Sequence, residues 1–146
     1  MNEPFKSLEH FKLQRLSNQK TKKIFYWVAT GLLAFELVFG ALWDLNIIFK
    51  GNALGVVKHL GYPDYLVTIL GICKLIAASI ILSPKMLLLK EWAYAGVFIL
   101  FAGAISSHLA GGDGIRAALQ AIIILCITVS SWLLRPSERK LPSIKI

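Results

Sequence analysis

The sequence predicts an all-α integral membrane protein, a bundle of four membrane-spanning helices with both termini in the cytoplasm. The 146-residue chain is 56% apolar, has a mean hydropathy of +0.65 and is only 16% charged. Soluble domains average roughly 45–50% apolar and about 25% charged residues. The net charge of +8 is concentrated outside the apolar stretches, which argues against a nucleic-acid-binding globule.

Four apolar stretches define the predicted spans. Each holds about 20–26 residues, enough to cross a hydrocarbon core of ~30 Å at a helical rise of ~1.5 Å per residue. Strict alternation of apolar and polar residues is absent from the sequence, so we expect helices rather than barrel strands. The predicted spans are residues 24–49, 62–82, 86–110 and 115–134.

Local sequence signals support these boundaries. Pro63 suits the first turn of the second span, Ser83 can cap the third, and Asp113 can cap the fourth after a glycine-rich break. Basic tails, residues 1–23 and 135–146, flank the membrane domain of residues 24–134. We expect the N-terminal segment to be a solvated tail, and a short helix lying on the headgroups is the alternative.

The basic residues predict the orientation. Twelve of the sixteen lysines and arginines lie on the side that carries both tails and the connection between the second and third spans. Three lie on the opposite side, and Lys74 lies inside a span. Because cytoplasmic segments are enriched in Lys and Arg, we place both termini in the cytoplasm and the spans in the lipid bilayer.

Two ionisable residues fall inside predicted spans. Glu36 lies ~18 Å and Lys74 ~12 Å from the cytoplasmic edge. A charge at the centre of a span costs about 2.5–3.5 kcal/mol, so such residues point to function. We expect the two to pair in the bundle interior. The pair would form a polar site for protons, ions or a head group, or would only fix helix register.

Further acidic and aromatic side chains extend this candidate site. Trp43 shares a helix face with Glu36, and Glu91 shares one with Tyr94. Groups of this kind around one cavity could hold a flat, polar-headed ligand such as a quinone. Packing is the alternative role of the aromatic rings. The candidate buried polar site comprises Glu36, Lys74, Glu91, Tyr94 and Trp43.

A second polar cluster is expected at the outer face. Asp44 and His108 lie ~30–33 Å from the cytoplasmic edges of their spans, and Asp113 and Arg116 begin the fourth span. A histidine beside carboxylates can exchange a proton near neutral pH. The alternative is a network that only caps and hydrates the helix ends. We expect no metal, because one His and two Asp lack a ligand spacing signature.

Small residues and cysteines indicate packing rather than chemistry. Gly103, Ser107 and Gly111, spaced by four, predict a stripe where another helix approaches closely. Cys73 and Cys126 fall at similar depths, so a disulfide is conceivable, but cysteines in membranes usually act as small apolar residues.

Three segments together resemble the DoxX-like family of small bacterial membrane proteins: HLGYPDYLVTILGICKLIAA, LKEWAYAG and SSHLAGGD. The resemblance covers the first to the fourth span and implies a four-helix bundle in the bacterial inner membrane. It also implies a link to redox complexes, since DoxX is named as a small subunit of a thiosulfate:quinone oxidoreductase. The polar positions in the matched segments are Lys74, Glu91, Trp92, Tyr94, His108 and Asp113, with Glu36 in the matching first span.

The sequence is compatible with three functions. The leading hypothesis is a membrane subunit of a redox system that contacts quinone, with membrane or redox proteins as partners. The alternative is a non-enzymatic assembly or interaction factor. A small transporter is a third hypothesis, less favoured because four spans without inverted repeats would require a homo-oligomer. The sequence assigns no catalytic residue.

Overall fold

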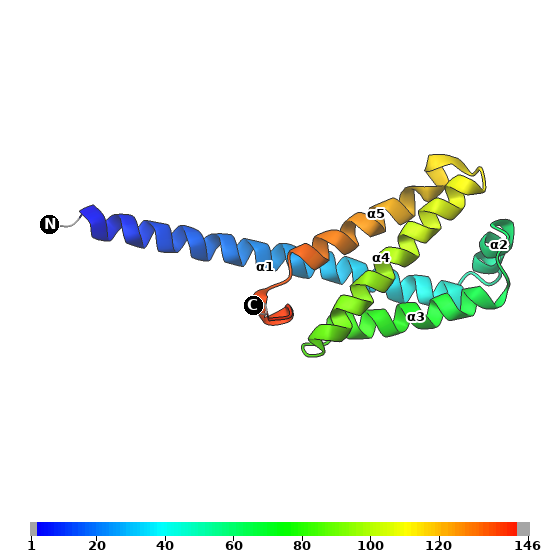
Figure 1. The fold of residues 1–146 in the computed structure, drawn as a ribbon, viewed down its shortest axis with the longest axis horizontal. Coiled ribbons are helices and arrows are strands. Elements are labelled where there is room, and N and C mark those ends of the chain that lie inside the picture. Colours follow the sequence, from blue (N-terminus) through cyan, green and yellow to red (C-terminus); the bar gives the residue numbers. More distant parts are fainter. Residues whose placement is uncertain (1–2, 143–146) are drawn as a thin grey trace.

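The computed structural model describes residues 3–142, with side chains from residue 16 onward. Within that range the chain forms five α-helices and a short 3-10 turn, so the predicted all-α class is confirmed (Figure 1). The elements are α1 (Glu3–Asp44), α2 (Asn52–His59), α3 (Tyr65–Leu82), α4 (Leu87–Ala110), α5 (Gly114–Leu133) and η1 (Ser137–Arg139). In the described part of the chain, four segments are long and apolar enough to cross a membrane: Leu16–Asp44, Tyr65–Leu82, Leu87–Ala110 and Gly114–Leu133.

Helix α1 is 42 residues long and continues without a break from the basic N-terminal region into the first span. The N-terminal segment is therefore helical and continuous with the span, and its described side chains from Leu16 to Phe25 are exposed, while its placement in solvent or on the headgroups stays a prediction. The reason lies in the composition. Between Pro4, in the first turn where proline is tolerated, and Gly31, the segment has no helix breaker and is rich in Lys, Leu and Gln.

Helix α1 also ends earlier than predicted, at Asp44 rather than near Phe49. Asn46 adopts a left-handed conformation with φ of 58°, which stops a right-handed helix. Its side-chain Oδ1 accepts a hydrogen bond from the backbone N–H of Gly51 at 2.9 Å. Residues 45–49, apolar except for Asn46, thus form a turn, and hydropathy alone could not separate this turn from the helix.

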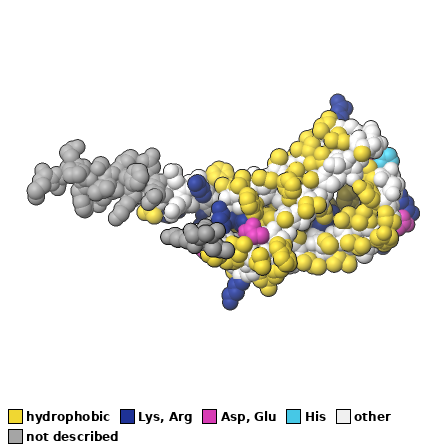
Figure 2. Space-filling model, viewed as in Figure 1, with side chains coloured by type: hydrophobic (Ala, Val, Ile, Leu, Met, Phe, Trp, Pro, Cys, Tyr) yellow, Lys and Arg dark blue, Asp and Glu magenta, His cyan; other side chains and the backbone are white. Residues whose placement is uncertain are grey.

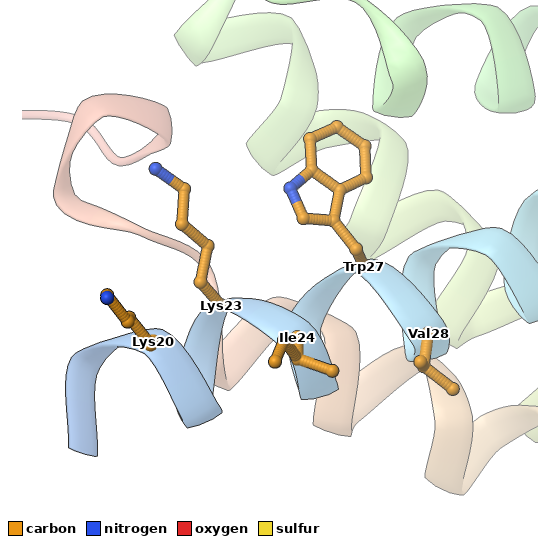
Figure 3. Close-up of a pocket in the computed structure, with 5 residues that line it drawn as sticks. All are labelled: Lys20, Lys23, Ile24, Trp27 and Val28. Carbon is orange, nitrogen blue, oxygen red and sulfur yellow. The ribbon is translucent and has the colours of Figure 1, made fainter. Parts of the chain in front are cut away.

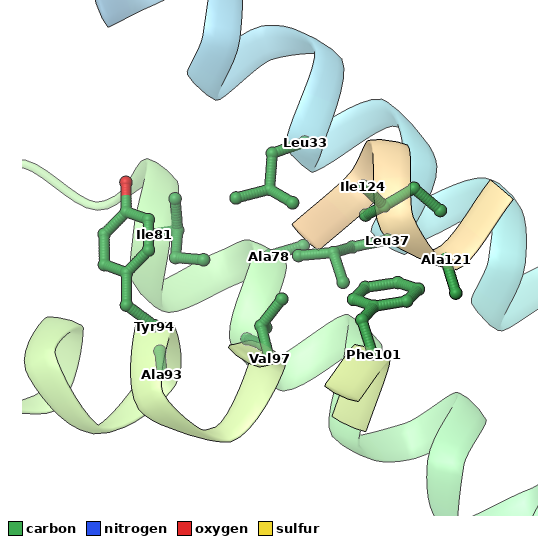
Figure 4. Close-up of a cluster of buried hydrophobic side chains, with 11 residues drawn as sticks. Leu33, Leu37, Ala78, Ile81, Ala93, Tyr94, Val97, Phe101, Ala121 and Ile124 are labelled. Carbon is green, nitrogen blue, oxygen red and sulfur yellow. The ribbon is translucent and has the colours of Figure 1, made fainter. Parts of the chain in front are cut away.

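The four long helices pack as two hairpins, α1 with α3 and α4 with α5. Their shared core contains Leu33 and Leu37 of α1, Ile81 of α3, Phe101 of α4 and Ile124 of α5 (Figure 4). We call the end that carries the chain termini and the α3–α4 connection the basic end. The end that carries α2 and the α4–α5 turn is the loop end. The hairpins diverge toward the loop end (Figure 1).

The outer surface of the bundle is largely apolar (Figure 2). Large side chains point outward from the spans, among them Phe35 at 67% and Ile99 at 68% exposed. Contiguous apolar surface of this kind is unfavourable in water and matches a lipid environment.

Candidate functional site

A cavity of about 500 Å³ lies at the loop end, between the two hairpins. The wider half of the molecule is visibly hollowed in Figure 2. Most of the wall is apolar, with Leu66, Leu70, Phe101 and Ile124 among the contributors. The polar and aromatic lining side chains come from several helices and one connection: Glu36, Trp43, Asp44, Tyr62, Lys74, Ser107, His108 and Gln120.

An ion pair between α1 and α3 forms one wall of this cavity. Lys74 Nζ donates to Asp44 Oδ2 at 2.7 Å, and the two side chains are only 12% and 8% exposed. Gly40 makes the approach feasible, because a Cβ at that position would lie 3.2 Å from Lys74 Nζ. A buried pair of this kind is stable only when both partners are present.

The pair expected from the sequence, Glu36 with Lys74, does not form. Glu36 lies two helical turns before Asp44 on α1 and accepts a hydrogen bond from Gln120 Nε2 at 3.4 Å. The predicted depths of Glu36 and Lys74 count residues from the ends of their spans, as if all spans started at one membrane edge. The packing of α1 on α3 instead brings Asp44 level with Lys74. Both Glu36 and Lys74 nevertheless line the same cavity, together with Trp43.

Glu91 and Tyr94 lie at the other end of the bundle and do not line the cavity. Glu91 accepts two hydrogen bonds from Arg135 Nη2, at 2.7 and 2.9 Å, and one from Trp132 Nε1 at 2.8 Å. The Tyr94 hydroxyl is bonded to Ser131 Oγ at 2.8 Å. The grouping of these two residues with the cavity is therefore corrected: α4 places them in the first turns of the helix, at the basic end.

A His–Asp–His cluster closes the loop end. Asp113 Oδ1 lies 2.6 Å from His59 Nε2, and Asp113 Oδ2 lies 2.7 Å from His108 Nδ1. The hydrogen bonds from His59 and then His108 lower the pKa of Asp113 below its ordinary value. His59 belongs to α2, in the connection between α1 and α3, and His108 belongs to α4. The Asp113 carboxylate therefore joins the α1–α3 hairpin to the α4–α5 hairpin.

The predicted outer-face cluster is only partly assembled. His108 and Asp113 meet, but Asp44 pairs with Lys74 and Arg116 is an exposed residue of α5. Sequence reasoning missed His59, because the short helix α2 that carries it fell in a presumed connection. Among the residues with described placement, no group of three His, Cys, Asp or Glu side chains is arranged to hold a metal ion.

The small-residue stripe on α4 borders the cavity along most of its length. A Cβ at Gly103 would meet no atom within 4 Å, so no neighbouring helix approaches there. Ser107 Oγ is hydrogen-bonded to Tyr62 Oη at 2.7 Å, and only Gly111 is closely packed, against Leu60 at 3.2 Å. The predicted close helix contact is therefore wrong at Gly103, which instead leaves space in the cavity.

Both cysteines are free thiols. Cys73 and Cys126 are exposed on the bundle surface and form no disulfide with one another. The helices that carry them, α3 and α5, run in the same direction through the bundle, but their packing does not bring the two thiols together.

The basic end holds a second set of buried charges that the sequence analysis did not foresee. Lys90, Arg135 and Arg139 are 0%, 5% and 7% exposed. Arg139 Nη2 donates to three backbone carbonyl groups where α3 ends, including Leu82 O at 2.9 Å, and Lys90 Nζ donates to Lys85 O. Arg139 and Lys90 are therefore compensated by backbone carbonyl groups at and just after the end of α3, whereas Arg135 is compensated by the Glu91 carboxylate.

An apolar exterior, four spans and a mainly apolar cavity that contains a buried ion pair define a multi-pass helical membrane protein. A family model described as the DoxX-like family matches residues 28–131. The chain therefore belongs to the DoxX-like family, as the three sequence segments indicated. No curated protein and no solved structure matches the chain.

Proposed function

We propose that this protein binds a lipid-soluble ligand of the quinone class in the loop-end cavity, as a membrane subunit of a redox system. The observation that supports this proposal is the composition of the cavity wall. The Asp44–Lys74 pair, Glu36 and Trp43 line the same cavity within the apolar spans. Intramembrane ionisable groups facing a cavity are a mark of ligand or proton sites.

The cavity offers complementary groups to each part of a quinone. Its volume of about 500 Å³ falls within the range of roughly 300–1,000 Å³ found for small-molecule pockets. The Lys74 ammonium and the Tyr62 hydroxyl are donors for ring carbonyl oxygens, and the Trp43 ring offers a stacking surface. The apolar wall suits an isoprenoid tail.

The position of the cavity also suits a ligand that dissolves in the bilayer. Two of its lining residues, Ile99 of α4 and Gln120 of α5, are exposed on the outside of the bundle. The cavity therefore reaches the bundle surface within the apolar spans. A lipid-soluble molecule would enter sideways from the membrane.

Titration of the purified protein in detergent with decylubiquinone tests the proposal. Quenching of Trp43 fluorescence reports binding, and Trp43→Phe separates this signal from the other tryptophans. We expect Gly103→Leu to abolish binding, because the new side chain fills the space beside Gly103.

Gly96→Leu is the matched control. Gly96 lies two turns earlier on α4, also has no atom within 4 Å of a built Cβ, and does not line the cavity. We expect it to bind decylubiquinone like the wild type. Failure of the wild type to bind, or unchanged binding by Gly103→Leu, would contradict the proposal.

A non-enzymatic assembly factor is the second candidate, and the buried ion pair favours it. In this interpretation the Asp44–Lys74 bond serves only to join α1 to α3. The double variant Asp44→Leu/Lys74→Met replaces both charges with apolar groups, a change often neutral or stabilising for folding. The assembly hypothesis predicts unchanged function in cells, whereas the quinone proposal predicts a folded protein that no longer binds the ligand.

A further inference from the structure

A groove of about 610 Å³ follows one face of α1 at the basic end. The residues with described side chains that line it follow helical spacing and thus share one face of α1: Lys20, Lys23, Ile24, Trp27 and Val28. Lys23 and Trp27 extend side by side from the helix, with the indole nitrogen on the side of Lys23 (Figure 3). Two ammonium groups and an indole N–H therefore border one open space.

The surroundings of the groove carry a large excess of positive charge. Among the side chains described at the basic end there are two glutamates, Glu91 and Glu138, against eight cations. The eight are Lys20, Lys22, Lys23, Lys85, Lys90, Arg135, Arg139 and Lys140. Glu138 forms an ion pair with Lys23 at 3.1 Å, but both side chains are more than half exposed. Such a pair is weak and would compete little with a bound anion.

A buried arginine beside the groove lacks a carboxylate partner among residues 16–142. The Arg139 guanidinium is stacked on the Trp27 ring at 5.0 Å and on the Tyr26 ring at 5.8 Å. Arg139 Nε, Arg135 Nη1 and the Tyr26 hydroxyl are buried and have no hydrogen-bond partner among residues 16–142. Arg135 is paired with Glu91, whereas Arg139 forms no ion pair with a carboxylate among the described side chains. Because the Arg139 guanidinium stacks on Trp27, an anion against that ring would offset the charge of Arg139.

The other described residues of the groove wall are apolar. Ile24 and Val28 are 64% and 55% exposed on the span side of the two lysines. A ligand that satisfies the whole groove therefore has an anionic head and hydrocarbon chains. Trp27 lies one helical turn after Lys23, the last of the N-terminal lysines, and tryptophan is enriched where a span meets the headgroups.

We propose that this groove is a binding site for an anionic phospholipid. The phosphate lies among Lys20, Lys23 and the Trp27 indole N–H, and the acyl chains lie along Ile24 and Val28. Basic residues beside a span attract anionic lipids, and the groove adds a defined location to that attraction. The site is separate from the loop-end cavity and does not depend on the function proposed for it.

Lipid titrations of the purified chain in detergent test the site, with binding read by native mass spectrometry. The probes are phosphatidylglycerol, phosphatidylcholine and inorganic phosphate. We expect phosphatidylglycerol to bind, phosphatidylcholine to bind at least about tenfold more weakly, and phosphate alone to bind more weakly still. Equal binding of the two lipids would overturn the proposal, and phosphate binding as tight as phosphatidylglycerol would overturn the lipid assignment.

Two charge-matched double variants separate a site from diffuse surface charge. Lys20→Gln/Lys23→Gln removes the two cations in the groove, and we expect a fall of about tenfold or more in affinity for phosphatidylglycerol. Lys22→Gln/Lys85→Gln removes two exposed cations at the same end but outside the groove, and its affinity should stay near the wild-type value. An equal loss in the two variants would contradict a defined site.

Trp27→Phe provides a third measurement. It keeps an aromatic ring under Arg139 but removes the indole N–H that borders the groove. We expect a smaller loss of phosphatidylglycerol affinity than in the double lysine variant, with thermal stability unchanged. If Trp27→Phe binds phosphatidylglycerol as tightly as the wild type, the indole N–H does not contact the lipid.

Discussion

The two ends of the bundle use similar residues in opposite ways. At the basic end, Glu91 accepts three hydrogen bonds from Arg135 and Trp132, so its oxygens are occupied by neighbours. At the loop end, Lys74 holds Asp44 through a single hydrogen bond, and both side chains face an open space of about 500 Å³. A buried ion pair therefore locks helices where neighbours complete its bonding, and remains available to a ligand where the helices diverge.

The largest expected effect tests the closed network at the basic end. Glu91→Ala leaves the Arg135 guanidinium, whose side chain is 3% exposed, without its carboxylate partner. Removing one member of a buried pair costs about 3–5 kcal/mol. The free energy of unfolding in detergent micelles measures the loss.

Glu138→Ala is the control for that variant. Its pair with Lys23 is exposed, so we expect a change below about 1 kcal/mol. If the two variants lose similar stability, the Glu91–Arg135 pair does not hold the helices together at the basic end.

A smaller loss is expected from a shared hydroxyl in the same region. Ser131 Oγ is bonded to both Thr30 Oγ1 and the Tyr94 hydroxyl, each at 2.8 Å. Ser131→Ala leaves two buried hydroxyl groups without this partner and should cost about 1–2 kcal/mol. Ser106→Ala removes a hydroxyl bonded only within its own helix and should change the unfolding free energy by less than about 0.5 kcal/mol.

The loop end predicts a change of the opposite sign. Gly103→Ala adds a methyl group where no atom lies within 4 Å, and alanine favours a helix over glycine by about 0.5–1 kcal/mol. The unfolding free energy should therefore rise by about that amount, as it should for Gly96→Ala. A loss of stability at Gly103 alone would show that the cavity is filled in the folded protein.

The smallest expected effect concerns pH at the His59–Asp113–His108 cluster. Hydrogen bonds from His59 and His108 lower the pKa of Asp113, so its contribution is complete above the ordinary carboxyl pKa of about 4. That contribution is lost as the pH falls through the lowered pKa. Hydrogen exchange at the α4–α5 turn should accelerate in this acid window in the wild type.

Asp113→Asn supplies the comparison for the pH measurement. Because its side chain does not titrate, its loop-end exchange should be faster above pH 4 and should lack the extra acid acceleration. If hydrogen exchange in Asp113→Asn depends on pH as it does in the wild type, the cluster does not control opening of the loop end.

Particular residues show which parts of the site could be predicted. The spans, the breaks at Pro63 and Ser83, and the presence of Glu36, Lys74 and Trp43 around one interior region follow from hydropathy and helical spacing. The partner of Lys74 could not be predicted, because a change of register between α1 and α3 moves Asp44 rather than Glu36 into reach. His59 was missed for a related reason: a short helix in a connection carries no periodic signal.

By itself, the sequence determined that this chain forms four apolar helices with charge concentrated at one end. The length of an apolar stretch and the positions of helix-breaking residues are local properties, so they can be read directly from the sequence. The tertiary structure decided where the hairpins separate, which carboxylate meets Lys74, and how Arg135 and Arg139 become buried at the basic end. These outcomes depend on packing between distant residues, where a shift of one helical turn exchanges one partner for another.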